Sequence, residues 1–276
     1  GKLLSHLHPN DKVKVEGFET IENRYNNYFD VVSSNIPFGD ISVFDATFMK
    51  QDALHRDSTR AIHNYFFVKG VESLQEGGIM AFITSQGAMN SPNNEPIRQW
   101  LMENTNLASA IRLPNNLFTD YAGTEVGSDL IVLQKNTAKE KLNFGEELFV
   151  KSSPLPITGI YNNNYFYDHT RIVQNKGFIG TDPYGKPAQV FLYEGGIDKM
   201  ADYMGQMLKS DLQSNLNLDL YNQHSTIQKQ EKAQVNISQS IQQESSDRQS
   251  QQSQTQDVKE KTTYQALEVN VSEPVM

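Results

Sequence analysis

Residues Asn35, Ile36, Pro37 and Phe38 have the types and the spacing to hold a flat ring that carries an amino group. The side-chain carbonyl of Asn35 and the backbone carbonyl of Ile36 are two acceptors, one for each hydrogen of an exocyclic amine. Pro37 fixes the backbone, so both acceptors are oriented before a ligand arrives. Phe38 offers a face on which the ring can stack. The four residues are therefore a candidate binding site for a ring amine.

This arrangement suits the transfer of a methyl group from S-adenosylmethionine to the amine. Acceptors that bind both N–H bonds localise the lone pair on nitrogen, which can attack the sulfonium methyl group in line without a strongly basic side chain. An adenine within a duplex cannot reach such a site, so the base has to be flipped out, and stacking on Phe38 replaces part of the lost stacking. Taken alone, the four residues are equally compatible with an ordinary Asn-x-Pro turn after a strand.

The elements around this motif alternate between short apolar runs and amphipathic segments. Runs rich in Val, Ile, Leu and Phe predict strands at residues 13–15, 29–34, 78–84, 107–114 and 128–135. Helices are predicted at residues 56–77 and 93–106. Strands separated by helices imply an α/β fold with a largely parallel sheet that is covered on both faces. Ligands of such sheets bind beyond the carboxyl ends of the strands, which is where Asn35 is expected to lie.

The C-terminal part of the chain has a different composition. Residues 222–256 are rich in Gln and Ser and contain almost no aromatic or large apolar residues. Such a segment cannot bury enough surface to offset the entropy cost of ordering it, which predicts disorder. A predicted helix at 194–221 precedes it. We therefore divide the chain into a partial catalytic domain at 1–150, an extension at 151–221 that ends in a helix, and a disordered linker or tail at 222–276.

Composition excludes several kinds of site and partner. The absence of cysteine excludes disulfides, thiolate metal sites and a cysteine nucleophile, and it indicates a reducing, cytoplasmic setting. No apolar run reaches the about 20 residues that cross a bilayer, so no membrane partner is expected. The histidines lack the spacing of metal ligands, so no metal is expected. Because the net charge is −9, contact with nucleic acid would need a local basic rim, for which the candidates are Lys50, Arg56, Arg60 and Arg98.

Four segments resemble the N6-adenine DNA methyltransferases, which are class I, S-adenosylmethionine-dependent enzymes. Residues 1–21 resemble the helix, strand and turn that carry the family's third motif. Residues 35–38 resemble the family's fourth motif, usually (Asp/Asn/Ser)-Pro-Pro-(Tyr/Phe). They are closer to the Asn-Ile-Pro-Phe-Gly form of large methylases of bacterial mobile elements, some of which continue into a helicase. Residues 77–101 resemble the family's fifth strand and the helix after it, and residues 111–135 resemble its last two strands with a Leu-Pro-x-x-x-Phe loop. The resemblance extends over about residues 1 to 195 and implies a Rossmann-like fold.

The resemblance also implies roles for individual residues. The residues that would hold the flipped adenine of a DNA substrate are Asn35, Ile36, Pro37 and Phe38. Ile36 stands where the family has its first proline, but the contact comes from the backbone carbonyl, so the chemistry is expected to be preserved. In the third motif the family often has Asp before Phe, whereas the order here is Gly17-Phe18-Glu19. Phe18 would pack on the adenine ring of the cofactor, and Glu19 would accept a hydrogen bond from its amine.

A further implication is that part of the domain lies outside this chain. The family binds the methionine end of its cofactor on a glycine-rich turn after the first strand and the ribose on an acidic residue that ends the second. No such turn precedes Val13. The sheet is therefore expected to lack its first two strands. The chain, which begins with Gly, is expected to be an N-terminally truncated fragment that is inactive alone, with a helicase-type region as a candidate downstream neighbour.

Two alternatives remain open. Motifs related to residues 35–38 also methylate amines of ribosomal RNA bases and glutamine side chains of proteins, because those nitrogens fit the same pair of acceptors. Alternatively, the chain is a non-catalytic remnant that only binds DNA or a partner.

Overall fold

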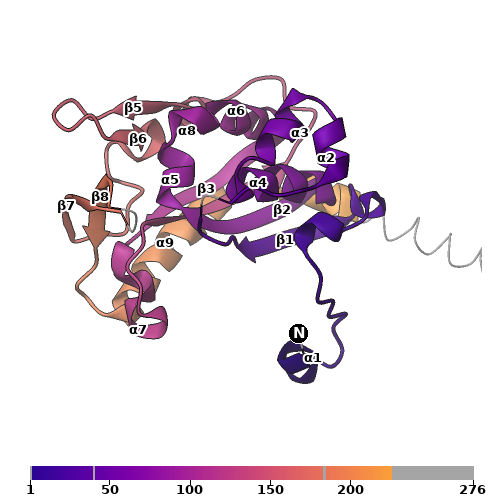
Figure 1. Ribbon diagram of the computed structural model, residues 1–276, viewed down its shortest axis with the longest axis horizontal. Coiled ribbons are helices and arrows are strands. Elements are labelled where there is room, and N and C mark those ends of the chain that lie inside the picture. The colour runs from indigo at the N-terminus through magenta and orange to yellow at the C-terminus, as the bar shows by residue number, and fades with distance from the viewer. Residues whose placement is uncertain (1, 40, 183–184, 226–276) are drawn as a thin grey trace, which may run out of the picture. The chain divides into compact units, whose positions relative to one another are not determined.

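A mixed four-stranded sheet lies at the centre of the computed structural model, which describes residues 2–39, 41–182 and 185–225 (Figure 1). The strand order is β1-β2-β4-β3. The bounds are Phe29–Asn35 for β1, Leu74–Ser85 for β2, Thr105–Leu113 for β3 and Ser128–Lys135 for β4. β1 pairs with β2 in parallel, whereas β4 is antiparallel to both β2 and β3. Three strands thus run in one direction and β4 runs against them.

The strand predictions are confirmed in four places and wrong in one. The four apolar runs from residue 29 onward all form strands of the sheet. Residues 13–15 form no strand, and the side chain of Val15 is largely exposed. A strand needs a neighbour for its backbone hydrogen bonds, and the described residues place none beside this segment. The expectation of a largely parallel sheet is right for strand direction but wrong for pairing, because two of the pairings are antiparallel.

The register brings the ends of all four strands to one edge of the sheet. Asn35 lies opposite Ile83, and Ser128 at the start of β4 lies opposite both Ser85 and Leu113. We call this the carboxyl edge, because β1, β2 and β3 end there. Open α/β sheets bind their ligands at such an edge.

One face of the sheet is covered by helices from the first part of the chain. Their bounds are Ala46–Lys50 for α2, Ala53–Ser58 for α3, Ile62–Ser73 for α4, Gln86–Asn90 for α5, Glu95–Asn104 for α6 and Phe144–Val150 for α8. α4 approaches β2 closely at Gly70, where an added Cβ would lie 2.9 Å from both Met80 Sδ and Phe82 Cζ. The predicted helix at 56–77 is therefore right in type and wrong at both ends, since α3 ends at Ser58 and β2 begins at Leu74.

The second predicted helix, at 93–106, is confirmed as α6. Pro96 lies in its first turn, where a missing backbone N–H costs nothing. Ile97 and Leu101 are buried in the main core, which also includes Tyr65, Phe67 and Phe82.

The opposite face carries the long helix α9, Ile197–Asn215, which packs on β3 and confirms the helix predicted at 194–221. A second apolar cluster lies between them, formed by Ile111, Leu113, Val173 and Met200. Residues 218–225 are helical again.

Two small hairpins join α8 to α9. One pairs β5, Ser152–Pro154, with β6, Tyr161–Asn163, and the other pairs β7, Lys176–Thr181, with β8, Pro187–Leu192. The remaining short helices are α1, Lys2–Leu7, and α7, Thr119–Ala122. Single turns of 3₁₀ helix lie at Phe18–Thr20 (η1), Asn23–Tyr25 (η2), Pro92–Asn94 (η3), Asn115–Phe118 (η4) and Asn164–Phe166 (η5).

Two predictions about how the chain is divided into domains remain untested. The domain boundary at residue 150 is not decided by the fold. The predicted disordered segment at 222–276 falls almost wholly outside the described residues. Within the ranges that the structure describes, no helix has both the length and the apolar character needed to cross a membrane.

Candidate active site

The motif Asn35-Ile36-Pro37-Phe38 lies at the carboxyl edge, as its sequence predicts. Asn35 is the last residue of β1, and its side chain is exposed. Ile36 is only 1% exposed, and its backbone N–H donates to the carbonyl of Ile83 at 2.9 Å. Pro37 is exposed and Phe38 is half-buried. The buried Ile36 side chain anchors the motif in the core while Asn35 and Pro37 face solvent, so a ligand can reach them.

Phe38 meets a second aromatic ring from a distant part of the chain. The ring centroids of Phe38 and Phe118 are 6.5 Å apart, and the rings are T-shaped. Phe118 ends η4, in the Leu-Pro-x-x-x-Phe loop that follows β3. The side chain of Asn115 fixes this loop by accepting from the backbone N–H of Phe191 in β8 at 3.0 Å. The sequence singled out the loop but did not identify Phe118 as a site residue.

A buried ion pair lies at the carboxyl edge, between β3 and β4. Arg112 Nε donates to Asp129 Oδ1 at 2.8 Å, and Arg112 Nη2 donates to Asp129 Oδ2 at 3.0 Å. The guanidinium also donates to the side chains of Asn162 and Asn90, and its carbon lies 4.2 Å from the centre of the Phe166 ring. Sequence reasoning missed this network. The signal that was available is an arginine inside an apolar strand.

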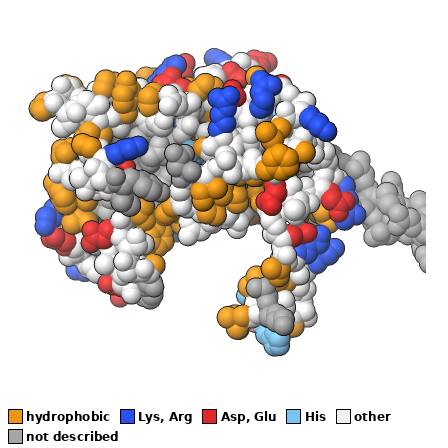
Figure 2. Space-filling view, viewed as in Figure 1, with side chains coloured by type: hydrophobic (Ala, Val, Ile, Leu, Met, Phe, Trp, Pro, Cys, Tyr) orange, Lys and Arg blue, Asp and Glu red, His pale blue; other side chains and the backbone are white. Residues whose placement is uncertain are grey.

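The predicted basic rim is wrong for one of its members. Arg98 is buried within α6 and donates to the backbone carbonyls of Val150 and Ser91, both at 2.9 Å, and to the hydroxyl of Ser152. Burial lowers the pKa of Arg98 to about 10. Lys50, Arg56 and Arg60 are exposed. Figure 2 shows basic side chains over the region of α6, α3 and α2 with acidic side chains close by, so the charge on this face is mixed.

The two predicted cofactor residues lie in η1, away from the motif. The ring of Phe18 is half-buried, with its centroid 4.8 Å from that of Phe66 and 6.1 Å from that of Tyr65. The side chain of Glu19 is exposed. Phe18 is thus held by α4, whereas Phe38 contacts η4.

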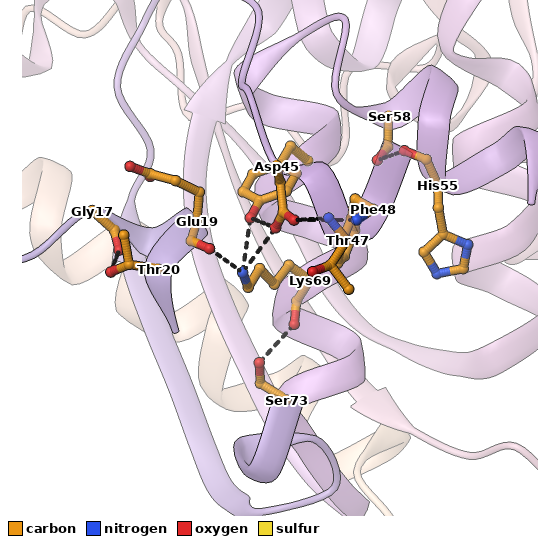
Figure 3. A network of polar contacts seen from close by, with 11 residues as sticks. Gly17, Glu19, Thr20, Asp45, Thr47, Phe48, His55, Ser58, Lys69 and Ser73 are labelled. Carbon is orange, nitrogen blue, oxygen red and sulfur yellow. Dashed lines mark hydrogen bonds and ion pairs between the residues drawn. The ribbon is translucent and has the colours of Figure 1, made fainter. Parts of the chain in front are cut away.

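The side chain of Lys69 in α4 lies at the centre of a buried polar network (Figure 3). Its ammonium donates to Tyr65 Oη at 2.9 Å, to Asp45 Oδ2 at 3.1 Å and to the backbone carbonyl of Glu19 at 3.2 Å. Tyr65 in turn donates to Asp45 Oδ2 at 2.6 Å. The network therefore joins η1, α4 and the residue that precedes α2.

Asp45 is ionised in this network. Burial alone would raise its pKa, but hydrogen bonds from Tyr65 and from the backbone N–H of Phe48, together with Lys69, hold the pKa below its ordinary value. The same carboxylate caps α2 by accepting from the N–H groups of Thr47 and Phe48. Burial and the neighbouring Asp45 raise the pKa of the Tyr65 hydroxyl, so Tyr65 stays a donor.

His55 in α3 belongs to a separate ion-paired group. Its two ring nitrogens lie 2.8 Å from Asp52 Oδ1 and 2.6 Å from Glu72 Oε1. Burial opposes a charge on the ring, but the hydrogen bonds to both carboxylates raise its pKa. In the part of the chain that the structure describes, no three His, Asp or Glu residues are grouped as metal ligands.

A polar motif at the carboxyl edge of a central sheet, backed by helices on the sheet faces, is typical of α/β enzymes. Residues 5–158 match the family model of the N-6 DNA methylases, so the chain belongs to this family. Members of this family transfer a methyl group from S-adenosylmethionine. No curated protein matches the chain.

Solved structures show partial similarity. A Listeria monocytogenes protein described as a candidate class I S-adenosylmethionine-dependent methyltransferase is 22% identical, with a TM-score of 0.34, over 42% of this chain and 34% of that chain. The M protein of the type I restriction enzyme EcoKI is 14% identical, with a TM-score of 0.35, over 67% of this chain and 48% of that chain. The chain spans less than half the length of either protein. Because the TM-scores are low, family membership rests on the sequence match.

Proposed function

We propose that this chain carries the substrate-holding half of an enzyme that methylates the N6 amine of a flipped adenine in DNA. The observation that carries the proposal is the placement of Asn35-Ile36-Pro37-Phe38 at the carboxyl edge, with Ile36 anchored in the core and Asn35 open to solvent. Membership of the N-6 DNA methylase family supports it.

The mechanism assigns a role to each motif residue. Asn35 Oδ1 and the Ile36 carbonyl accept the two N–H bonds of the adenine amine, which localises the nitrogen lone pair and aims it. Pro37 restricts the backbone at Ile36, which carries the second acceptor, so no reorganisation is needed during the reaction. S-adenosylmethionine, when bound, supplies an electrophilic methyl group on a positively charged sulfur. The surplus proton leaves to water after transfer, because a methylated ring amine is weakly basic.

Phe38 and Phe118 together provide the apolar surface for the flipped base. Extrusion from the duplex costs a few kcal/mol of pairing and stacking. Stacking of a base on an aromatic ring returns about 1–3 kcal/mol. The two ring centroids are 6.5 Å apart and the ring planes are inclined at 66°, so the pair presents a face and an edge to a flat ring that enters from solvent.

The described residues fit the adenine end of the methyl donor. Phe18 is half-buried, so part of its ring is free to pack on an adenine, and the exposed Glu19 carboxylate is an acceptor for the adenine amine. We propose that the methionine end is held by an upstream segment and that the chain is inactive without it. A helicase-type region linked to the parent protein is a further expectation from the resemblance to helicase-linked methylases.

Transfer of a tritiated methyl group from S-adenosylmethionine tests the function, with DNA, ribosomal RNA and a glutamine-containing release factor as separate acceptors. The full-length protein is expected to label DNA, and Asn35→Ala is expected to abolish labelling while donor binding stays within about twofold. Asn93→Ala, at an exposed asparagine in η3, is the matched control and should transfer normally.

Preferential labelling of RNA or protein would replace the DNA assignment with one of the alternative acceptors. Full activity of the Asn35→Ala variant would remove the motif from the mechanism. Binding of DNA without any methyl transfer would favour the non-catalytic remnant.

A further inference from the structure

We propose that Lys69 is a positioning residue that fixes the turn of Phe18 and Glu19 relative to the segment that follows the substrate motif. The description of these two segments as donor-binding and substrate-binding rests on the proposed function above. The ammonium of Lys69 reaches both of them from α4, and its side chain is only 6% exposed (Figure 3).

The first contact is with the backbone of η1. Lys69 Nζ donates to the Glu19 carbonyl at 3.2 Å and lies 5.6 Å from the centre of the Phe18 ring. Figure 3 shows the Glu19 carbonyl directed toward Lys69 and the Glu19 carboxylate directed away from it. The bond to Lys69 thus fixes the orientation of the Glu19 peptide group, from which the side chain extends on the other side.

The second contact is with Asp45, which ends the segment after the motif. Asp45 Oδ2 accepts from Lys69 Nζ at 3.1 Å, and Asp45 Oδ1 caps α2 by accepting from Thr47 and Phe48. The segment is also held before Asp45, since Val43 donates its N–H to the Thr59 carbonyl at 2.8 Å and Ile62 donates to the Ile41 carbonyl at 2.7 Å. Lys69 therefore attaches the turn to a segment that is already fixed to α3 and α4.

The ammonium has just enough donors for this task. Its three N–H bonds have three acceptors in three different segments, namely Glu19 O, Tyr65 Oη and Asp45 Oδ2. A buried ammonium is stable only when paired and hydrogen-bonded, and Asp45 supplies the opposite charge. An apolar side chain could fill the same volume but would leave the Glu19 carbonyl without this donor, so the turn would be held to α4 only by the packing of the Phe18 ring.

The variant that tests this is Lys69→Met combined with Asp45→Asn. Lys69→Met alone would leave a buried unpaired carboxylate and could prevent folding. Asn in place of Asp45 removes that charge and is still a good helix cap for α2. The double variant is expected to fold with a melting temperature near that of the wild type, but the backbone of η1 loses its hydrogen bond to α4 and only the packing of the Phe18 ring remains. The wild type is the reference, because Asp45→Asn alone would leave the buried Lys69 ammonium without its opposite charge.

Two measurements read out the position of the turn. In this chain, hydrogen exchange at the Thr20 and Ile21 amides, which donate to Gly17 and Phe18, should be about tenfold faster in the double variant than in the wild type. In the full-length protein, KM for S-adenosylmethionine should rise about tenfold, while kcat and the KM for DNA stay within about twofold. Restoring the donor with Lys69→Arg and Asp45 intact should return most of the affinity for the methyl donor.

The matched control is Lys176→Met, which removes an ammonium from the exposed pair with Glu194 and should change neither measurement. Unchanged exchange at Thr20 and Ile21 together with an unchanged donor KM in the double variant would overturn the inference. Absence of methyl transfer by the full-length wild-type protein would overturn the proposed function instead. In that case the hydrogen-exchange comparison alone decides whether Lys69 fixes the turn.

Discussion

Arg112 and Asp129 form an ion pair in which both side chains are 0% exposed. They lie directly opposite each other in the antiparallel pairing of β3 with β4, next to the end of both strands at the carboxyl edge. Both carboxylate oxygens accept from the guanidinium, and its remaining donors reach Asn90 and Asn162. Because Asn90 belongs to α5 and Asn162 to β6, the pair joins three parts of the structure beside the candidate site.

Removing one member of this pair should be strongly destabilising. We expect Asp129→Ala to lower the free energy of unfolding by about 3–5 kcal/mol, because the Arg112 charge is then buried without a partner. Urea unfolding followed by circular dichroism measures the change. The exposed pair of Lys151 and Glu95 is the comparison, where Lys151→Ala should cost no more than about 1 kcal/mol. Equal effects at the two sites would contradict the buried role of Arg112.

Two glycine substitutions, one at the contact of α4 with β2 and one in α9, should have opposite effects on stability. Gly70→Ala should lower stability by about 1–3 kcal/mol, because the new Cβ would lie 2.9 Å from Met80 Sδ and Phe82 Cζ. Gly205→Ala, in the interior of α9 with no atom within 4 Å of the new Cβ, should raise stability by about 0.5–1 kcal/mol. Thermal unfolding of both variants decides the matter, and stabilisation by Gly70→Ala would show that α4 can move away from β2.

Sequence patterns predict strands well where a strand is covered on both faces. β4 was predicted with its observed bounds, Ser128–Lys135, because its apolar run is continuous. The pairing order was not predictable in the same way, since an apolar run has the same pattern in a parallel and an antiparallel neighbourhood. The prediction of a strand at residues 13–15 was wrong because alternating apolar residues form a strand only when a neighbouring strand is present.

The residues of the candidate site also differ in whether the sequence predicts them. Asn35 was predicted at the end of a strand because the residue types change abruptly after the apolar run. Phe118 and Lys69 were not predicted, because their partners lie far away in the sequence. A lysine on a helix is ordinarily solvated, and only the packing of η1 and Asp45 around Lys69 shows that it is buried.

The pair of carboxylates on His55 predicts a pH dependence of stability. The pKa of His55 is raised in the folded chain, so its stabilising contribution is complete below the unfolded value of about 6.5 and is lost as pH rises through the folded pKa. We therefore expect the unfolding free energy of the wild type to fall as pH rises above about 6.5. His55→Gln should remove this part of the dependence.

NMR titration of the His55 ring gives an independent measurement of the same quantity. The expected midpoint lies above that of a histidine in an unfolded peptide, since Asp52 and Glu72 favour the charged ring. A midpoint below the peptide value would mean that burial outweighs the two carboxylates, and the stability of the wild type would then rise with pH up to about 6.5.

The contact of Phe38 with Phe118 predicts a measurable role for a residue outside the motif. If the two rings together hold the flipped base, Phe118→Ala should lower kcat/KM for DNA by about 5- to 150-fold, the equivalent of losing about 1–3 kcal/mol of stacking. Phe118→Tyr keeps the ring and should retain most of the activity. The affinity for S-adenosylmethionine should not change, because Phe118 contacts Phe38 and not η1. Phe144→Ala, at an exposed phenylalanine at the start of α8, controls for the loss of an aromatic ring. Equal kcat/KM for Phe118→Ala and Phe144→Ala would restrict the aromatic surface to Phe38 alone.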